Sequence, residues 1–131
     1  MKINKEEYKK IELSIEKWDI VFLYWDLWAW KTTLTQYILN NLFDIQERIK
    51  SPTYIHYKKY KENIYHFDLY RLESYDEFVN IWWEEILDNK DNISIIEWPE
   101  LIEKYYKPKY NIFIKKIEWN DEEREIEVIS E

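Results

Sequence analysis

A lysine and two threonines, Lys31-Thr32-Thr33, open an amphipathic segment directly after a short apolar run. A phosphate-binding loop has the pattern G-x-x-x-x-G-K-[ST] between a strand and a helix. Its glycines let backbone N–H groups close around phosphates, its lysine supplies a positive charge and its hydroxyl ligates Mg²⁺. Positions 25–32 read W-D-L-W-A-W-K-T, so tryptophan stands at both positions that require glycine. Glycine in place of Trp25, Trp28 and Trp30 would give G-D-L-G-A-G-K-T, a full match.

Two acids could complete this chemistry. Asp68 follows the run "IYHF", and Glu97 follows the run "ISII". Acids at the carboxyl ends of inner strands lie beside a phosphate-binding loop, where they can hold Mg²⁺ through water or orient an attacking water. Either acid could instead be a solvated carboxylate at a strand end, but the loop pattern favours the chemical role. His66, two positions before Asp68, is interpreted as a structural histidine.

The elements that must position these residues can be read from hydrophobic periodicity. The segments "IVFLY" (20–24) and "ISIIE" (93–97) are short apolar runs, as expected of buried strands. Buried strands together with helical segments predict an α/β layered sheet with mixed strand directions, flanked by helices. The other expected elements are helices over 5–17, 31–42, within 74–88 and from Pro99 to about Tyr105, a hairpin of 53–60 with 63–70, and edge strands at 110–117 and 124–130.

Composition limits the class of protein. The chain has 131 residues, which fits one domain over 1–131. Its net charge is −8, from 27 acidic and 19 basic residues, so direct, tight binding of nucleic acid is not expected. It has no cysteine, its first residues are charged, and no apolar run approaches the roughly 18 residues of a membrane span. We therefore expect a cytoplasmic protein without a membrane partner.

Four motifs come in a suggestive order: the loop with glycine restored, "SPTY" at 51–54, "YHFDLYRL" at 65–72 and "IIEWPE" at 95–100. Together they resemble the TsaE family of small bacterial P-loop ATPases, which are needed to make threonylcarbamoyladenosine on tRNA. The resemblance runs from about Ile15 to the C-terminus, and the last three motifs carry it even when the loop is ignored. It implies a single P-loop ATPase domain that binds ATP and Mg²⁺ and acts on a TsaB–TsaD-type protein complex.

The resemblance also implies roles for individual residues. Asp68 and Glu97 would be catalytic, with Glu97 in the Walker-B-like position, and Thr32 and Glu97 would serve the metal. Lys31 would contact the β- and γ-phosphates, and Thr33 would help to hold the α-phosphate. Ser51 and Thr53 would lie in a switch-like segment near the γ-phosphate. The full set expected to contact the nucleotide is Trp25, Asp26, Leu27, Trp28, Ala29, Trp30, Lys31, Thr32, Thr33, Ser51, Thr53 and Trp98.

The tryptophans of the loop belong to a wider anomaly. The chain has eight Trp and no Gly, whereas average usage of about 7% would give roughly nine glycines. Beyond the loop, Trp18 and Trp82 stand where the family has Gly, and Trp119 stands in an expected turn. Some bacterial lineages read the codon UGA as Gly, while its common alternative reading is Trp. We infer that UGA was read as Trp where the natural protein has Gly; a genuinely Trp-rich chain and a deliberate replacement are the alternatives.

Two other functions are compatible with parts of this pattern. A small P-loop kinase of a nucleotide or metabolite would share the loop, but such kinases usually have a mobile lid rich in arginine, and this chain has only three arginines, with no cluster. A degenerate scaffold that binds the partner but no nucleotide would explain the loop if its tryptophans are real.

Overall fold

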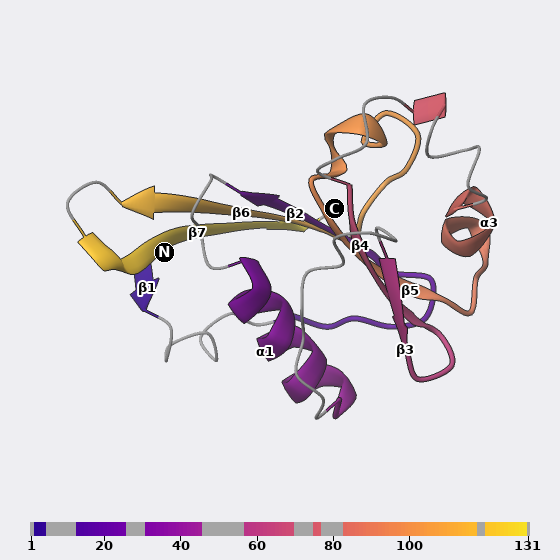
Figure 1. Ribbon diagram of the computed structural model, residues 1–131, viewed down its shortest axis with the longest axis horizontal. Helices are drawn as coiled ribbons and strands as arrows, with labels where there is room; N and C mark the ends of the chain where they lie inside the picture. The colour runs from indigo at the N-terminus through magenta and orange to yellow at the C-terminus, as the bar shows by residue number, and fades with distance from the viewer. Residues whose placement is uncertain are drawn as a thin grey trace.

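The computed structural model describes residues 2–4, 13–25, 31–45, 57–69, 75–76, 83–117 and 120–130. Within these ranges the chain forms a seven-stranded sheet in the order β1-β7-β6-β2-β5-β4-β3 (Figure 1). The strands are β1 (Lys2–Asn4), β2 (Ile20–Trp25), β3 (Tyr57–Tyr60), β4 (Ile64–Asp68), β5 (Ile93–Glu97), β6 (Tyr110–Ile117) and β7 (Asn120–Ser130). The helices are α1 (Lys31–Phe43), α3 (Trp83–Asp88) and the 3₁₀ turn η2 (Pro99–Leu101).

The sheet is parallel at its centre and antiparallel at its sides. β2 pairs in parallel with β5 and β6, and β4 pairs in parallel with β5. The pairs β1–β7, β3–β4 and β6–β7 are antiparallel. This confirms the predicted α/β fold with mixed strand directions.

Alternation along the central strands builds one core on each face of the sheet. Val21 and Leu23 of β2 pack in a cluster with Ile38 and Leu39 of α1. Side chains one position out of phase, such as Phe22, join a second cluster that contains residues of α3. Because neighbouring residues of a strand point to opposite faces, α1 and α3 cover opposite sides of the sheet. None of the helices in the described ranges is long and apolar enough to cross a membrane.

Most of the expected elements are present. The strand expected at 20–24 is β2, the helix expected at 31–42 is α1, and the strand at 93–97 is β5. The hairpin is formed by β3 and β4, joined by a turn in which Lys61 has φ 52°. Residues 53–56 and 70 of that prediction lie outside the described ranges.

Three expectations need correction. Residues 13–16 of the expected helix over 5–17 are not helical, because the chain enters a turn in which the Asp19 N–H donates to the Glu16 carbonyl; residues 5–12 are outside the described part. The helix expected from Pro99 is only the 3₁₀ turn η2, followed by further turns. The segments 110–117 and 124–130 are not edge strands, since β6 lies between β2 and β7, and β7 between β6 and β1. Alternation reports which face of a strand is buried, not which edge is free.

Candidate functional site

The frame of the predicted phosphate-binding loop is present. β2 ends at Trp25 and α1 begins at Lys31, so five residues connect a central parallel strand to the helix that packs on it. Figure 1 shows the two elements. Residues 26–30, Ser51 and Thr53 lie outside the described ranges, and Trp25, Lys31, Thr32 and Thr33 are described by their backbone alone. For these residues the contacts with a nucleotide stay predictions.

The two predicted acids are brought together at the carboxyl ends of neighbouring strands. Asp68 is the last residue of β4 and Glu97 the last of β5, and the two are register partners. On its other side Glu97 pairs with Leu23 of β2, two residues before that strand ends. The Leu69 N–H donates to the Glu97 carbonyl (3.1 Å), and the Trp98 N–H donates to the Leu23 carbonyl (3.2 Å). The pairing therefore continues past the acids and holds both strand ends beside the start of the loop.

Glu97 is a fully buried carboxylate with one side-chain partner given by the structure. Its Oε2 lies 2.9 Å from His66 Nε2, and both side chains have no exposed surface. Within the described part of the chain, Glu97 Oε1 and His66 Nδ1 have no hydrogen-bond partner. Burial of a carboxylate is costly unless its oxygens are bonded. An oxygen left over at this place is therefore suited to a ligand, such as a water molecule or a metal ion.

The contact of His66 with Glu97 was missed in the sequence, where His66 is interpreted as structural. The signal was present in the spacing. His66 and Asp68 are two residues apart on one strand, so their side chains share a face of the sheet. The parallel neighbour β5 ends in Glu97 on that same face. What the sequence does not show is the register of β4 against β5.

Asp68 completes the acidic end of the sheet and is 7% exposed. Among the residues that the structure describes, no group of three or more histidines, cysteines and acids could hold a metal by itself. Mg²⁺ does not need such a group, since it keeps several waters and is usually bound through one or two carboxylates together with substrate phosphates. The acids at the ends of β4 and β5, with the hydroxyl expected from Thr32, fit that kind of donor set.

Three tryptophans outside the loop differ in their surroundings. Trp83 is 3% exposed and contacts Tyr57 and Phe67 with ring centroids 5.5 and 5.4 Å apart, as a genuine core tryptophan would. Trp18 is 54% exposed and has φ 72°, a backbone region that favours glycine. This observation supports the prediction of glycine at position 18.

Trp98 shares the positive φ of Trp18 but packs against the core. It has φ 59°, although we interpret it as a genuine tryptophan of the family. Its side chain packs against both core clusters, so burial offsets the backbone strain. Trp25, in contrast, belongs to a strand and is not among the described residues with positive φ. The prediction of glycine at position 25 therefore depends on the approach of the phosphate and not on the backbone angle.

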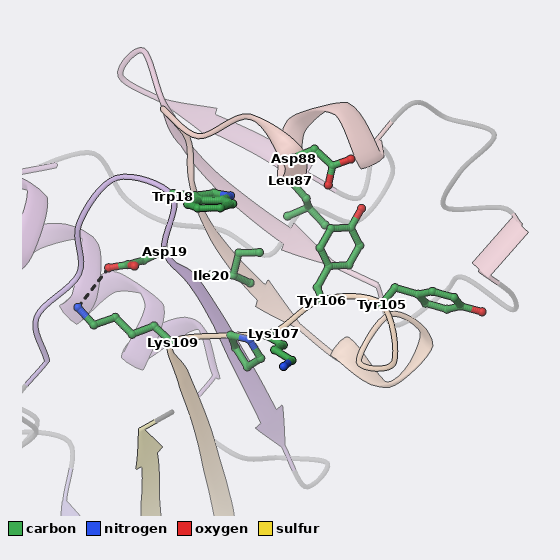
Figure 2. Close-up of a pocket in the computed structure, with 10 residues that line it drawn as sticks. Trp18, Asp19, Ile20, Leu87, Asp88, Tyr105, Tyr106, Lys107 and Lys109 are labelled. Carbon is green, nitrogen blue, oxygen red and sulfur yellow. Dashed lines mark ion pairs between the residues drawn. The ribbon is translucent and has the colours of Figure 1, made fainter.

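A hollow of about 840 Å³ lies at the opposite end of β2 (Figure 2). Trp18, Ile20 and Tyr106 line it, and Lys109 forms an ion pair with Asp19 at 3.4 Å on its wall. Burial, with the nearby Asp88 carboxylate, raises the pKa of the Tyr106 hydroxyl. Ligands of open parallel sheets bind outside the carboxyl ends of the strands. The hollow is at the amino end, so it is not the nucleotide site.

Comparisons with known proteins agree with the geometry. The family model described as "Threonylcarbamoyl adenosine biosynthesis protein TsaE" matches residues 3–126. Two proteins named "tRNA threonylcarbamoyladenosine biosynthesis protein TsaE" are similar to this chain. The one from Rickettsia felis is 38% identical, and the match covers 80% of this chain and 64% of the relative. The one from Haemophilus influenzae is 37% identical, and the match covers 92% of this chain and 76% of the relative. The crystal structure of Bacillus subtilis YdiB is similar with a TM-score of 0.68 and 26% identity, over 99% of this chain and 84% of that one. The chain thus spans less than two thirds of the length of the Rickettsia relative.

Proposed function

Because the chain belongs to the TsaE family, we propose that it binds and hydrolyses ATP as a subunit required for threonylcarbamoyladenosine modification of tRNA. We place its action on a TsaB–TsaD-type partner complex. One observation carries the proposal: Glu97 and Asp68 end neighbouring parallel strands, next to the strand that leads into the predicted loop. This is where an acid must lie to act on a phosphate held at the start of α1.

We assign the following roles in binding and hydrolysing the nucleotide. Backbone N–H groups of 26–30 and the Lys31 ammonium would hold the phosphates, and Thr32 with Glu97 would hold the metal. Asp68 would orient the attacking water or serve the metal through water, and Ser51 and Thr53 would respond to the γ-phosphate. Mg²⁺, when bound, supplies positive charge that stabilises the charge developing on the phosphoryl group.

The proposal includes the natural residues of the loop. A Cβ atom at a left-handed backbone position costs about 1–2 kcal/mol, and an indole would also fill the space that the phosphates need. We therefore propose that the natural protein has Gly at positions 18, 25, 28, 30, 82 and 119. We call that version the glycine form, and the sequence with Trp the tryptophan form.

The charge of the chain supports a role that depends on a partner. A net charge of −8 disfavours close approach to the phosphates of tRNA. Contact with the tRNA would then fall to the partner complex, while this chain supplies the ATPase.

The test is ATP hydrolysis by the glycine form with and without a TsaB–TsaD-type complex. We expect ADP release to depend on the complex, and Glu97→Gln and Asp68→Asn each to lower the rate about 10²- to 10³-fold, because each removes a group that aligns water or metal. Nucleotide binding, measured by calorimetry, should be largely retained in both variants. Hydrolysis at the parent rate by either variant would refute the role of that residue. ADP formed only when a phosphoryl acceptor is added would indicate a kinase instead.

A further inference from the structure

The contact between His66 and Glu97 carries an inference that rests on the proposed function and extends it. We propose that His66 is a positioning residue, which binds Glu97 Oε2 through its Nε2–H and so presents Oε1 to the reacting groups. The supporting geometry is the 2.9 Å separation of Nε2 and Oε2 between two fully buried side chains.

The sheet explains how the two side chains meet. His66 pairs with Ile95 in the parallel ladder of β4 and β5, and Glu97 lies two residues further along β5 on the same face. The histidine therefore reaches its partner diagonally across two hydrogen-bonded strands. A ring that is anchored on a central strand has little freedom, so it can fix a carboxylate that otherwise has three rotatable side-chain torsions.

The two oxygens of Glu97 have different surroundings. Oε2 faces the histidine, whereas Oε1 has no partner among the described residues. A merely structural pair would gain by satisfying every buried polar atom. An acid that must bind water or metal needs one oxygen held and the other available, which is the arrangement seen here.

The direction of the hydrogen bond follows from the donors available. An ionised carboxylate only accepts, so Nε2 carries the proton. His66 Nδ1 has no partner within the described ranges, and a proton there would be a buried donor left unsatisfied. We therefore assign the proton of this hydrogen bond to Nε2. The histidine then acts as a fixed donor, and its role does not require it to exchange a proton.

Two amide substitutions separate this role from packing. The side-chain nitrogen of glutamine is as many bonds from Cβ as Nε2 of histidine is, so His66→Gln can donate to Glu97 Oε2. The nitrogen of asparagine is one bond closer and corresponds to Nδ1, so His66→Asn cannot reach. Both are neutral amides that differ by one methylene.

In the glycine form with its partner complex, we expect His66→Gln to keep kcat within about threefold of the parent. We expect His66→Asn to lower kcat about 10- to 100-fold, because a hydrogen bond to a charged group is worth about 1.5–3 kcal/mol. KM and the calorimetric affinity for ATP should change much less than kcat in both variants. Equal kcat values for the two variants, or a loss that appears only in KM, would overturn the positioning role.

A second measurement needs neither activity nor a substitution of His66. The chain has two histidines, so in the ¹⁵N-histidine-labelled parent a His56→Gln variant assigns the ring signals. We expect His66 to carry a slowly exchanging proton on Nε2, and Glu97→Ala to abolish the slow exchange. An Nε2 without a proton, or with a freely exchanging one, would refute the contact even if His66→Asn fails to fold.

The two measurements distinguish the possible failures. If the parent hydrolyses no ATP with the complex, the proposed function fails, while the ring signals still test the contact. If the parent hydrolyses ATP and His66→Asn matches it, the positioning role alone fails.

Discussion

At the scale of single residues, backbone angle and burial taken together separate the tryptophans that belong in the fold from Trp18, which combines a positive φ with an exposed side chain. Trp83 contacts the rings of Tyr57 and Phe67, so its large side chain contributes to the core. Trp18 has positive φ and is more than half exposed, and a Lys90 ammonium lies 5.2 Å from the centre of its ring. An exposed cation–π contact is worth only about 0.5–1 kcal/mol, which is close to the backbone cost that opposes it.

A pair of substitutions in the tryptophan form tests this difference. Trp18→Gly should change the free energy of unfolding by no more than about 1 kcal/mol, because relief of the left-handed backbone offsets the lost contact and the entropy of glycine. Trp83→Ala should lower it by about 3–5 kcal/mol through loss of buried area and a cavity. Denaturant unfolding measures both. A loss at Trp18 as large as that at Trp83 would show that Trp18 is a structural residue.

At the scale of elements, strands and helices could be predicted where one physical signal dominated. β2, β5 and α1 follow from apolar runs and from helical spacing, and the site inherits its position from them. The contact that was missed, between His66 and Glu97, joins residues 31 positions apart on two strands. It depends on the register of those strands, which local periodicity does not reveal. The helix expected over 5–17 shows a different limit: the helical spacing of Tyr8, Ile11 and Ile15 predicted it, but residues 13–16 are not helical and lead into the turn that carries Trp18.

Helix α1 carries a buried hydroxyl group whose contribution to stability can be tested. Thr35 on this helix is fully buried, and its Oγ1 has no hydrogen-bond partner in the part of the chain described. Thr35→Val removes the buried hydroxyl and keeps the shape, so the free energy of unfolding should rise by about 1–3 kcal/mol. The control Thr35→Ser keeps the hydroxyl, loses a methyl group and should be destabilising. A drop in the thermal midpoint for Thr35→Val would mean that the hydroxyl is bonded in solution.

At the scale of the whole molecule, parallel pairing brings the two acids and the end of β2 to the same end of the sheet. Glu97 and Asp68 come from strands far apart in the sequence, yet both lie at the end of the sheet where β2 ends, because β2, β5 and β4 run in the same direction. The hollow beside Trp18 lies at the other end and is separated from this chemistry by the length of β2. The position of each acid directly after an apolar run was sufficient to predict this arrangement, because the carboxyl ends of parallel strands lie at one end of a sheet.

The most direct test of the account is calorimetric titration of Mg²⁺–ATP into the glycine form, the tryptophan form and the Lys31→Ala variant of the glycine form. We expect the glycine form to bind, because its loop lets backbone N–H groups and Lys31 meet the phosphates, and the tryptophan form to show no binding. Lys31→Ala should bind about 10- to 100-fold more weakly, as expected for loss of a charge-assisted contact. Comparable affinities for the glycine and tryptophan forms, or no binding by the glycine form, would contradict a phosphate-binding loop at the carboxyl end of β2.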